Sequence, residues 1–299
     1  MGFGGDITGF NVTNGQVLWT WTTPDSGLET VYGNYPLWVG FNLDPTVAGG
    51  EVLIGGGHEY NPPMFQGSQL WAVNTTSGKT EWSILGFDTE AAAAVSDGVM
   101  VDYNSYDCQI YAYSMGPAQI TVNAPSVGVT TQTPITISGT ITDISAGSKQ
   151  EAVAANFPSG LPCVSDSSMS NWMEYVYMQQ QKPTNTTGVP ITISVIDSNG
   201  NNRVIGTTTS TIYGTYSLTW TPDISGDYTV IADFAGTQSY YPSEAATAFH
   251  SSEPVATASP QPTQAPSMAD LYFVPGIVGV IVAIIVVGAV LLLALRKRP

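Results

Sequence analysis

The sequence predicts an all-β fold: a partial β-propeller of about 2.5 blades, an Ig-like β-sandwich with a small helical insertion, and one C-terminal transmembrane helix. Three observations support this prediction. An Asn-x-x-x-Gly turn recurs between apolar runs near the N-terminus, short strands of period 2 follow one another in the middle, and a long uncharged apolar run precedes a basic C-terminus.

The first zone, residues 1–117, contains a repeat. ITGFNVTNGQVLW (Ile7–Trp19) and LWAVNTTSGKTEW (Leu70–Trp82) align without a gap, and a partial third copy begins at Ile110. A period of about 40 residues between the last two copies is typical of one propeller blade of four antiparallel strands. The longer spacing of the first two copies predicts an inserted loop within Leu28–Gly50.

The second zone, residues 118–250, is rich in Thr, Ser, Val and Ile and predicts about seven short strands, the number expected of an Ig-like sandwich. Tyr228 follows Gly226-Asp227 where a tyrosine corner would lie. The clearest candidate strands are Pro134–Thr142, Val189–Asp197, Val204–Thr211, Gly214–Thr221, Asp227–Phe234 and Ala245–Phe249.

An insertion at about 146–183 interrupts this alternation. Met169, Trp172, Met173 and Val176 recur at helical spacing, which predicts an amphipathic helix with its apolar face packed against the body. A shorter helix is expected near residues 149–156.

The C-terminal part is expected to anchor the chain in a membrane. Residues 251–270 read as a Pro/Ser/Thr-rich stalk, 271–295 as a transmembrane helix and 296–299 as a basic cytoplasmic tail. Val274–Leu295 contains no charged residue, and as a helix it would span roughly 33 Å, enough for a bilayer core of about 30 Å. A basic flank marks the cytoplasmic side of a membrane.

Charge and local motifs bear on the location of the body. The net charge of −16 argues against nucleic-acid binding. The N-terminus, MGFGGDITGF, does not resemble a signal peptide, so a tail-anchored protein with a cytosolic body is one alternative. The sequons at Asn11, Asn74 and Asn185, together with the stalk, favour an extracellular glycoprotein, and a missing N-terminal part then explains the absent signal.

The first zone resembles the blades of PQQ-type (quinoprotein-like) β-propeller proteins. The unit is apolar–aromatic–Ala–x–Asn–x–x–(Thr/Ser/Asn)–Gly–x–x–x–Trp, carried by Leu70–Trp82 and more loosely by Ile7, Asn11, Gly15 and Trp19. The resemblance implies that the Asn and the Gly form a tight turn, and that the Trp docks between neighbouring blades. Because a closed propeller needs at least four blades, either upstream blades are missing or another copy completes the ring, and the first alternative is favoured.

Residues 118–299 resemble archaeal cell-surface proteins in which a propeller precedes an Ig-like domain, a stalk and a membrane anchor. The similarity lies in VGVTTQTPITISGT, AVAANFPSGLPCVSD, GTYSLTWTPDISGDYTVIADFAGTQSYYPS and the terminal RKRP. It implies a non-enzymatic, single-pass surface protein that acts in adhesion, envelope organisation or ligand binding, with a surface protein or a glycan as partner. The alternatives are the C-terminal part of a PQQ-dependent oxidoreductase and a scaffold for envelope protein assembly.

No catalytic, cofactor-binding or metal-binding residue is predicted. Asp102, Asn104 and Asp107 are of types that bind calcium, but a turn between two strands explains them better. Outside the cell, Cys108 and Cys163 are candidates for a disulfide that would join the last blade to the helical insertion. Two unrelated buried thiols are the alternative.

Overall fold

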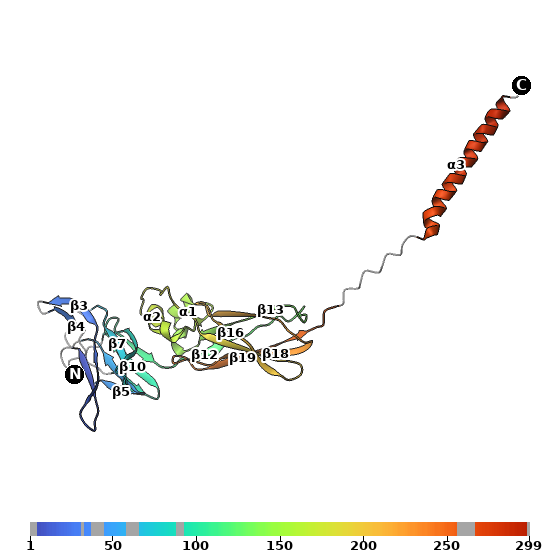
Figure 1. The fold of residues 1–299 in the computed structure, drawn as a ribbon. Coiled ribbons are helices and arrows are strands. Elements are labelled where there is room, and N and C mark those ends of the chain that lie inside the picture. Colours follow the sequence, from blue (N-terminus) through green and yellow to red (C-terminus); the bar gives the residue numbers. More distant parts are fainter. Residues whose placement is uncertain are drawn as a thin grey trace. The chain divides into compact units, whose positions relative to one another are not determined.

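The structure, a computed structural model, describes residues 5–30, 33–36, 45–57, 66–87, 93–255 and 267–297. The chain divides into two compact units, Met1–Glu253 and Pro254–Pro299. In Figure 1 the N-terminal sheets run from blue to cyan-green, the sandwich from green to orange, and the C-terminal helix is red.

The N-terminal region consists of small antiparallel sheets. A two-stranded, a four-stranded and a three-stranded sheet follow one another along the chain, and a separate hairpin lies in the predicted insertion. Their strands are β1 (Asp6–Phe10) and β2 (Val17–Thr22); β5 (Thr46–Ala48), β6 (Glu51–Gly55), β7 (Gln69–Asn74) and β8 (Thr80–Leu85); β9 (Ala94–Ser96), β10 (Val99–Asn104) and β11 (Gln109–Tyr113); and β3 (Asp25–Thr30) and β4 (Gly33–Pro36) in the hairpin.

The aligned repeats form the same turn, as predicted. In the β1–β2 hairpin the amide of Gly15 donates to the carbonyl of Asn11 over 2.8 Å, and in the β7–β8 hairpin Gly78 donates to Asn74 over 2.9 Å. Both glycines have left-handed backbones, with φ of 71° and 67°. The side-chain oxygens of Asn11 and Asn74 accept backbone amides two residues ahead over 2.9 Å.

The repeat tryptophans pack between neighbouring sheets. The indole of Trp19 donates to the carbonyl of Thr75 over 2.9 Å and covers Gly78, so it packs the first hairpin onto the second. Trp82 lies 6.5 Å, ring to ring, from Tyr113 in the next sheet. One face of the middle sheet therefore packs against β1–β2 and its other face against β9–β11.

We call this arrangement of three packed sheets the stack. In the described residues its sheets lie as layers, and they do not close into a ring of blades.

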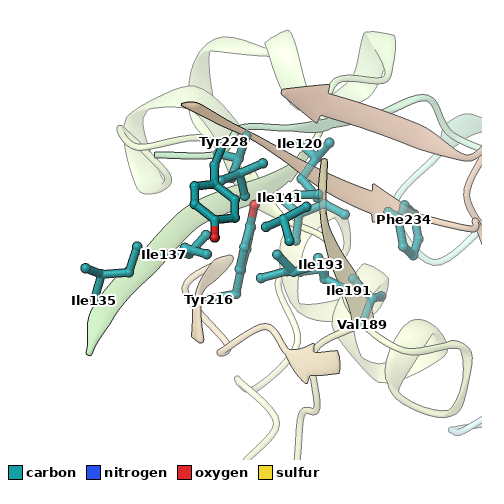
Figure 2. Packing of buried hydrophobic residues seen from close by; sticks show 14 of the residues in the cluster. Ile120, Ile135, Ile137, Ile141, Val189, Ile191, Ile193, Tyr216, Tyr228 and Phe234 are labelled. Carbon is teal, nitrogen blue, oxygen red and sulfur yellow. The ribbon is translucent and has the colours of Figure 1, made fainter. Parts of the chain in front are cut away.

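The predicted sandwich is confirmed, with its core between two sheets. One sheet contains β12 (Ala118–Ile120), β13 (Ile135–Asp143), β14 (Leu161–Pro162) and β17 (Thr215–Trp220); the other has the order β16 (Asn202–Thr209), β15 (Pro190–Ile196), β18 (Gly226–Phe234) and β19 (Ser243–Ser251). Apolar side chains alternate inward from both sheets, and Ile137, Ile141, Ile191 and Ile193 are fully buried (Figure 2).

The tyrosine corner is present at the start of β18. The hydroxyl of Tyr228 donates to Asp223 Oδ1 over 2.9 Å and accepts the amide of Ile224 over 3.1 Å. Its ring is fully buried, stacked on Phe249 at 5.1 Å (the labelled Tyr228 lies in the core in Figure 2). The bond pins the loop before β18 to the core.

The helical insertion also forms as predicted. A 3₁₀ turn (η1, Ala146–Lys149) leads into α1 (Glu151–Asn156), and α2 spans Asp166–Tyr177. Trp172 is buried and packs edge-on against Phe157 at 5.7 Å. Met169 and Met173 pack beside it, which confirms that the apolar stripe is a packing face.

Helix α2 is bonded to both regions of the first unit. At its N-terminus, the Asp166 carboxylate accepts the hydroxyls of Thr237 and Ser239 over 2.8 and 2.7 Å. Near its C-terminus, Glu174 Oε1 accepts the amide of Leu85 in strand β8 over 2.7 Å. The helix therefore joins the sandwich to the edge of the stack.

The second unit contains helix α3, Met268–Arg296. Its segment Leu271–Arg296 is long and apolar enough to cross a membrane, and none of that segment is buried inside the protein. The predicted helix is confirmed, beginning slightly earlier than expected. Most of the predicted stalk, residues 256–266, lies outside the described residues.

Candidate functional site

One face of the three-stranded sheet is largely apolar, and its side chains are exposed in the part of the chain that the structure describes. Along β10 the side chains alternate strictly: Met100, Asp102 and Asn104 are buried, and the residues between them are exposed. Val99, Val101 and Tyr103 are 38, 39 and 41 % exposed. Since alternate residues of a strand point to opposite faces, these three share the outer face.

Cross-strand pairing extends this face onto both neighbouring strands. Ile110 of β11 pairs with Tyr103, and Ala112 pairs with Val101, while Ala94 of β9 pairs with Val101 from the other side. Directly paired residues project from the same face of a sheet. Ser96 of β9 pairs with Val99 and shares this face. We call this surface the β10 face; it comprises Ala94, Ser96, Val99, Val101, Tyr103, Ile110 and Ala112. Ile110 is 73 % exposed.

The opposite end of the stack is the β1–β2 hairpin, whose outer face carries polar cross-strand pairs. On the outer face of β1–β2, Thr22 donates to Asp6 over 2.7 Å, and the hydroxyls of Thr8 and Thr20 lie 3.4 Å apart. Phe10, Val17 and Leu18 on the same hairpin are 57, 58 and 57 % exposed. This end of the stack therefore combines polar cross-strand pairs with exposed apolar side chains.

The β10 face was not predicted from the sequence. The buried side chain of Asn104 accepts the amide of Phe87 over 3.2 Å and donates to the carbonyl of Leu85 over 3.1 Å. A feature of the sequence that could have indicated this orientation is the pair Asp102 and Asn104, two polar residues at alternate positions of the strand. Their shared face is the buried one, where Asn104 forms hydrogen bonds, and the valines lie on the other face.

Of the three residues considered for calcium, Asp102 is buried within strand β10, while Asn104 and Asp107 bond within the β10–β11 hairpin turn. Besides its bonds to Phe87 and Leu85, Asn104 accepts the amide of Tyr106 over 3.0 Å. Asp107 accepts the amide of Gln109 over 3.2 Å and the hydroxyl of Tyr111 over 2.5 Å. Across the ranges that the structure describes, no group of three His, Cys, Asp or Glu side chains is placed to hold a metal ion.

The candidate disulfide is not formed: Cys108 and Cys163 are both free thiols. Cys163 is fully buried in the sandwich core, where burial foremost, and then the charge of Asp143, raise the pKa of its thiol. Cys108 is exposed at the tip of the β10–β11 hairpin, with φ of 58°. The expected pairing failed because spacing along the chain did not indicate that one thiol belongs to a closed core and the other to a surface turn.

Cys108 lies beside the β10 face. A hydrogen bond between its thiol and the Tyr103 hydroxyl raises the pKa of Tyr103. Since Tyr103 belongs to the β10 face, the exposed thiol is at the edge of that face.

The three sequon asparagines differ in environment. Asn74 is half-buried and its amide donates to Glu81 over 2.9 Å while its oxygen accepts two turn amides. Asn11 is half-buried in the equivalent turn. Asn185 is exposed, between α2 and β15. It is the most accessible of the three to a modifying enzyme.

Comparison with known proteins gives distant structural similarity. No family model and no curated protein matches the chain. Among solved structures, it is similar to a tetra-tandem repeat in the extending region of a large adhesion protein (16 % identity, 67 % of this chain, TM-score 0.27), and it covers 44 % of that chain. It is also similar to fibronectin(III)-like modules of Clostridium thermocellum CbhA (13 % identity, 72 % of this chain and 92 % of that one, TM-score 0.27).

Proposed function

We propose that this protein is a non-enzymatic, single-pass cell-surface protein that displays β-domains for adhesion, envelope organisation or ligand binding. The observation that carries the proposal is helix α3, whose apolar segment is uncovered and long enough to cross a bilayer. A soluble protein would bury such a surface, because exposed apolar area of this extent is unfavourable in water. The partner expected is a second surface protein or a glycan.

The proposed topology places the body outside the cell and the C-terminus in the cytoplasm. Arg296 and Lys297 follow the apolar segment directly, and basic residues flank the cytoplasmic side of membrane helices. The strongly acidic composition of the rest of the chain is compatible with an exterior location. Asn185, exposed and in a sequon, is the proposed site of glycosylation.

The proposed domain organisation follows the sequence zones, with the stack as PQQ-type blade repeats and the sandwich as an Ig-like domain after residue 117. Its support is the four-stranded sheet with strands in chain order, packed on a neighbouring sheet at each face. Such sheets, each docked on the next, are the units of propellers.

The topology is tested on intact cells that express the full chain. After treatment with a membrane-impermeant reductant, a membrane-impermeant maleimide should label Cys108, which is exposed, and leave the buried Cys163 unmodified. Cys108→Ser is the matched control and should abolish labelling. An Asn185→Gln change should lower the apparent mass if the sequon is glycosylated.

Two results would contradict the proposal. Labelling that requires permeabilised cells would place the body in the cytosol, as in a tail-anchored protein. Release of the protein from membranes by alkaline carbonate would show that α3 does not span the bilayer.

A further inference from the structure

We propose that the open edge of strand β1 accepts one extended β-strand of a separate polypeptide, which is apolar at three consecutive positions and pairs antiparallel with β1. The register is the one that β6 has on β7. This inference goes beyond the surface location proposed above and does not depend on it, because it rests on the geometry of the stack alone.

The first sheet is half of a unit that the chain builds completely in the middle sheet. The repeat aligns β1 with β7 and β2 with β8. In the middle sheet, β6 pairs with β7 on the side away from β8, and β5 follows β6. Within the described residues β1 pairs with β2 alone, so the position that β6 fills on β7 is open on β1.

The open edge presents backbone groups that β2 does not use. The carbonyl of Gly5 accepts an amide from the chain directly after β2 over 3.0 Å, and the amide of Asn11 donates to the carbonyl of Gln16 over 2.8 Å. Both bonds run toward the β2 side, and the direction of bonding alternates along a strand. The amides and carbonyls of Thr8 and Phe10 therefore point to the open side, as they do in a strand that can accept another.

A second observation is an apolar side chain that lies exposed beneath the open position. Val47 of β5 pairs directly with Val52 of β6, so the two side chains share one face of the middle sheet. Val52 is buried in one cluster with Ile7 of β1, whereas Val47 is 63 % exposed. The indole of Trp21 in β2 donates to Thr80 in β8 over 2.9 Å, which places β2 on the β8 side. A strand added on the open side of β1 therefore covers β5, and with it Val47.

Strand β6 shows which chemistry this edge takes. Residues 52–54 of β6, Val-Leu-Ile, pair with three consecutive residues of β7 whose counterparts in β1 are residues 8–10. The central donor side chain lies opposite Gly9 and points toward the middle sheet and Val47, and a neighbouring one contacts Phe10, which is 57 % exposed.

The donor is a separate polypeptide, because every strand in the described part of the chain already belongs to a sheet. In strand addition, main-chain hydrogen bonds supply affinity and alternate side chains supply specificity. The partner is therefore a stretch of apolar strand.

The test titrates the full chain in detergent with a blocked peptide that copies residues 50–56, GEVLIGG, followed by two lysines for solubility. Fluorescence anisotropy of the labelled peptide measures the dissociation constant, and hydrogen exchange resolved to single amides locates the site. The amides of Thr8 and Phe10 should gain protection, because they become donors to the added strand. The amides of β10, at the other end of the stack, should not change.

Two N-methylated peptides form a matched pair. In β6 the amide of Gly56 donates to β7, so by alternation the amides of Val52 and Ile54 face β7 and those of Leu53 and Gly55 face away. Methyl groups on the Val52 and Ile54 nitrogens should weaken binding at least about tenfold, because two hydrogen bonds are lost. The same two groups on Leu53 and Gly55 should leave the constant within about threefold.

A matched pair of protein variants tests the apolar residue beneath the edge. Val47→Lys places a charge under the added strand and should weaken binding at least about tenfold. Val101→Lys adds the same charge at an exposed valine of β10 and should leave the constant within about twofold. Circular dichroism and the melting temperature verify that both variants fold.

Three results would overturn the proposal. The first is no gain of protection at Thr8 and Phe10 with millimolar peptide, and the second is equal affinity of the two N-methylated peptides. The third is protection of those amides in the chain alone, which would show that a second copy or another segment of the chain fills the edge; sedimentation velocity would distinguish these two. None of these results bears on the labelling of Cys108, so the surface location and the strand site fail separately.

Discussion

The stack and the sandwich are both built from short antiparallel strands, yet they bury their apolar side chains differently. The sandwich closes on itself: side chains from both of its sheets meet in one cluster, with Ile191, Ile193 and Val195 fully buried. The stack has two smaller clusters, one on each face of its middle sheet, and its last sheet has an uncovered apolar face. A sandwich is complete with two layers, whereas stacked sheets require a partner or a polar face at each end.

The largest expected difference comes from truncating an apolar residue in each region. Ile193→Ala should destabilise the sandwich by about 2–5 kcal/mol, because it leaves a cavity in a closed core. Val101→Ala, at an exposed position of the β10 face, should change the stability of the monomer by less than about 0.5 kcal/mol. Hydrogen exchange, followed separately on peptides from β15 and β10, measures both effects. A cost above about 1 kcal/mol for Val101→Ala in the monomer would show that the face is covered.

The sequence predicted the sandwich and the helices well because their signals are local. Period-2 alternation gave β13, β15, β18 and β19, and the helical spacing of Met169 and Trp172 gave the packing face of α2. The Asn and Gly of the repeat specified their turn by backbone chemistry alone.

The features that the sequence did not predict depend on contacts between residues far apart in the chain. The sequence indicated neither that Asn104 bonds to Leu85, which turns β10 outward, nor that Cys163 lies in a closed core. No local pattern reports on such contacts. The β10 face was not predicted from the sequence for the same reason.

The repeat turns provide the next comparison, within the stack itself. Gly15 and Gly78 have the same left-handed backbone, but a Cβ at Gly15 would meet open space, while one at Gly78 would lie 2.5 Å from the Trp19 ring. Gly15→Ala should therefore cost only the backbone strain, about 1–2 kcal/mol. Gly78→Ala should add overpacking against Trp19, about 1–3 kcal/mol more.

The measurement is the free energy of opening of the β1–β2 and β7–β8 hairpins by hydrogen exchange. Equal costs for the two substitutions would indicate that Trp19 does not dock on the second hairpin. The double variant Gly78→Ala with Trp19→Ala is the control, since removing the ring should also remove the extra cost.

The smallest effects are expected at the two ends of α2, which joins the two regions through the carboxylates of Asp166 and Glu174. Their pKa values are shifted in opposite directions. The largest single influence on the pKa of Asp166 is burial, which acts to raise it. The hydrogen bonds that the carboxylate accepts act in the opposite direction and together outweigh burial, so the pKa is lowered; they come from the hydroxyls of Ser239 and Thr237 and from the amides of Gln238 and Ser239. Its contribution to stability is complete above the unfolded pKa of about 3.9 and is lost as pH falls through the lower folded value. Asp166→Asn should flatten that loss of stability in acid.

Glu174 should show the reverse dependence. Burial raises its pKa, and the amide of Leu85 only partly offsets the shift. Between the unfolded pKa of about 4.3 and the higher folded value, the folded chain binds more protons, so this group makes the protein less stable as pH rises. Glu174→Gln keeps an acceptor for Leu85 without the charge and should remove that decline. Each change should be below about 1 kcal/mol, because both carboxylates remain partly in solvent, and urea titrations from pH 3 to 7 would measure them. The same sign of pH dependence for the two variants would show that α2 does not join the regions through these bonds.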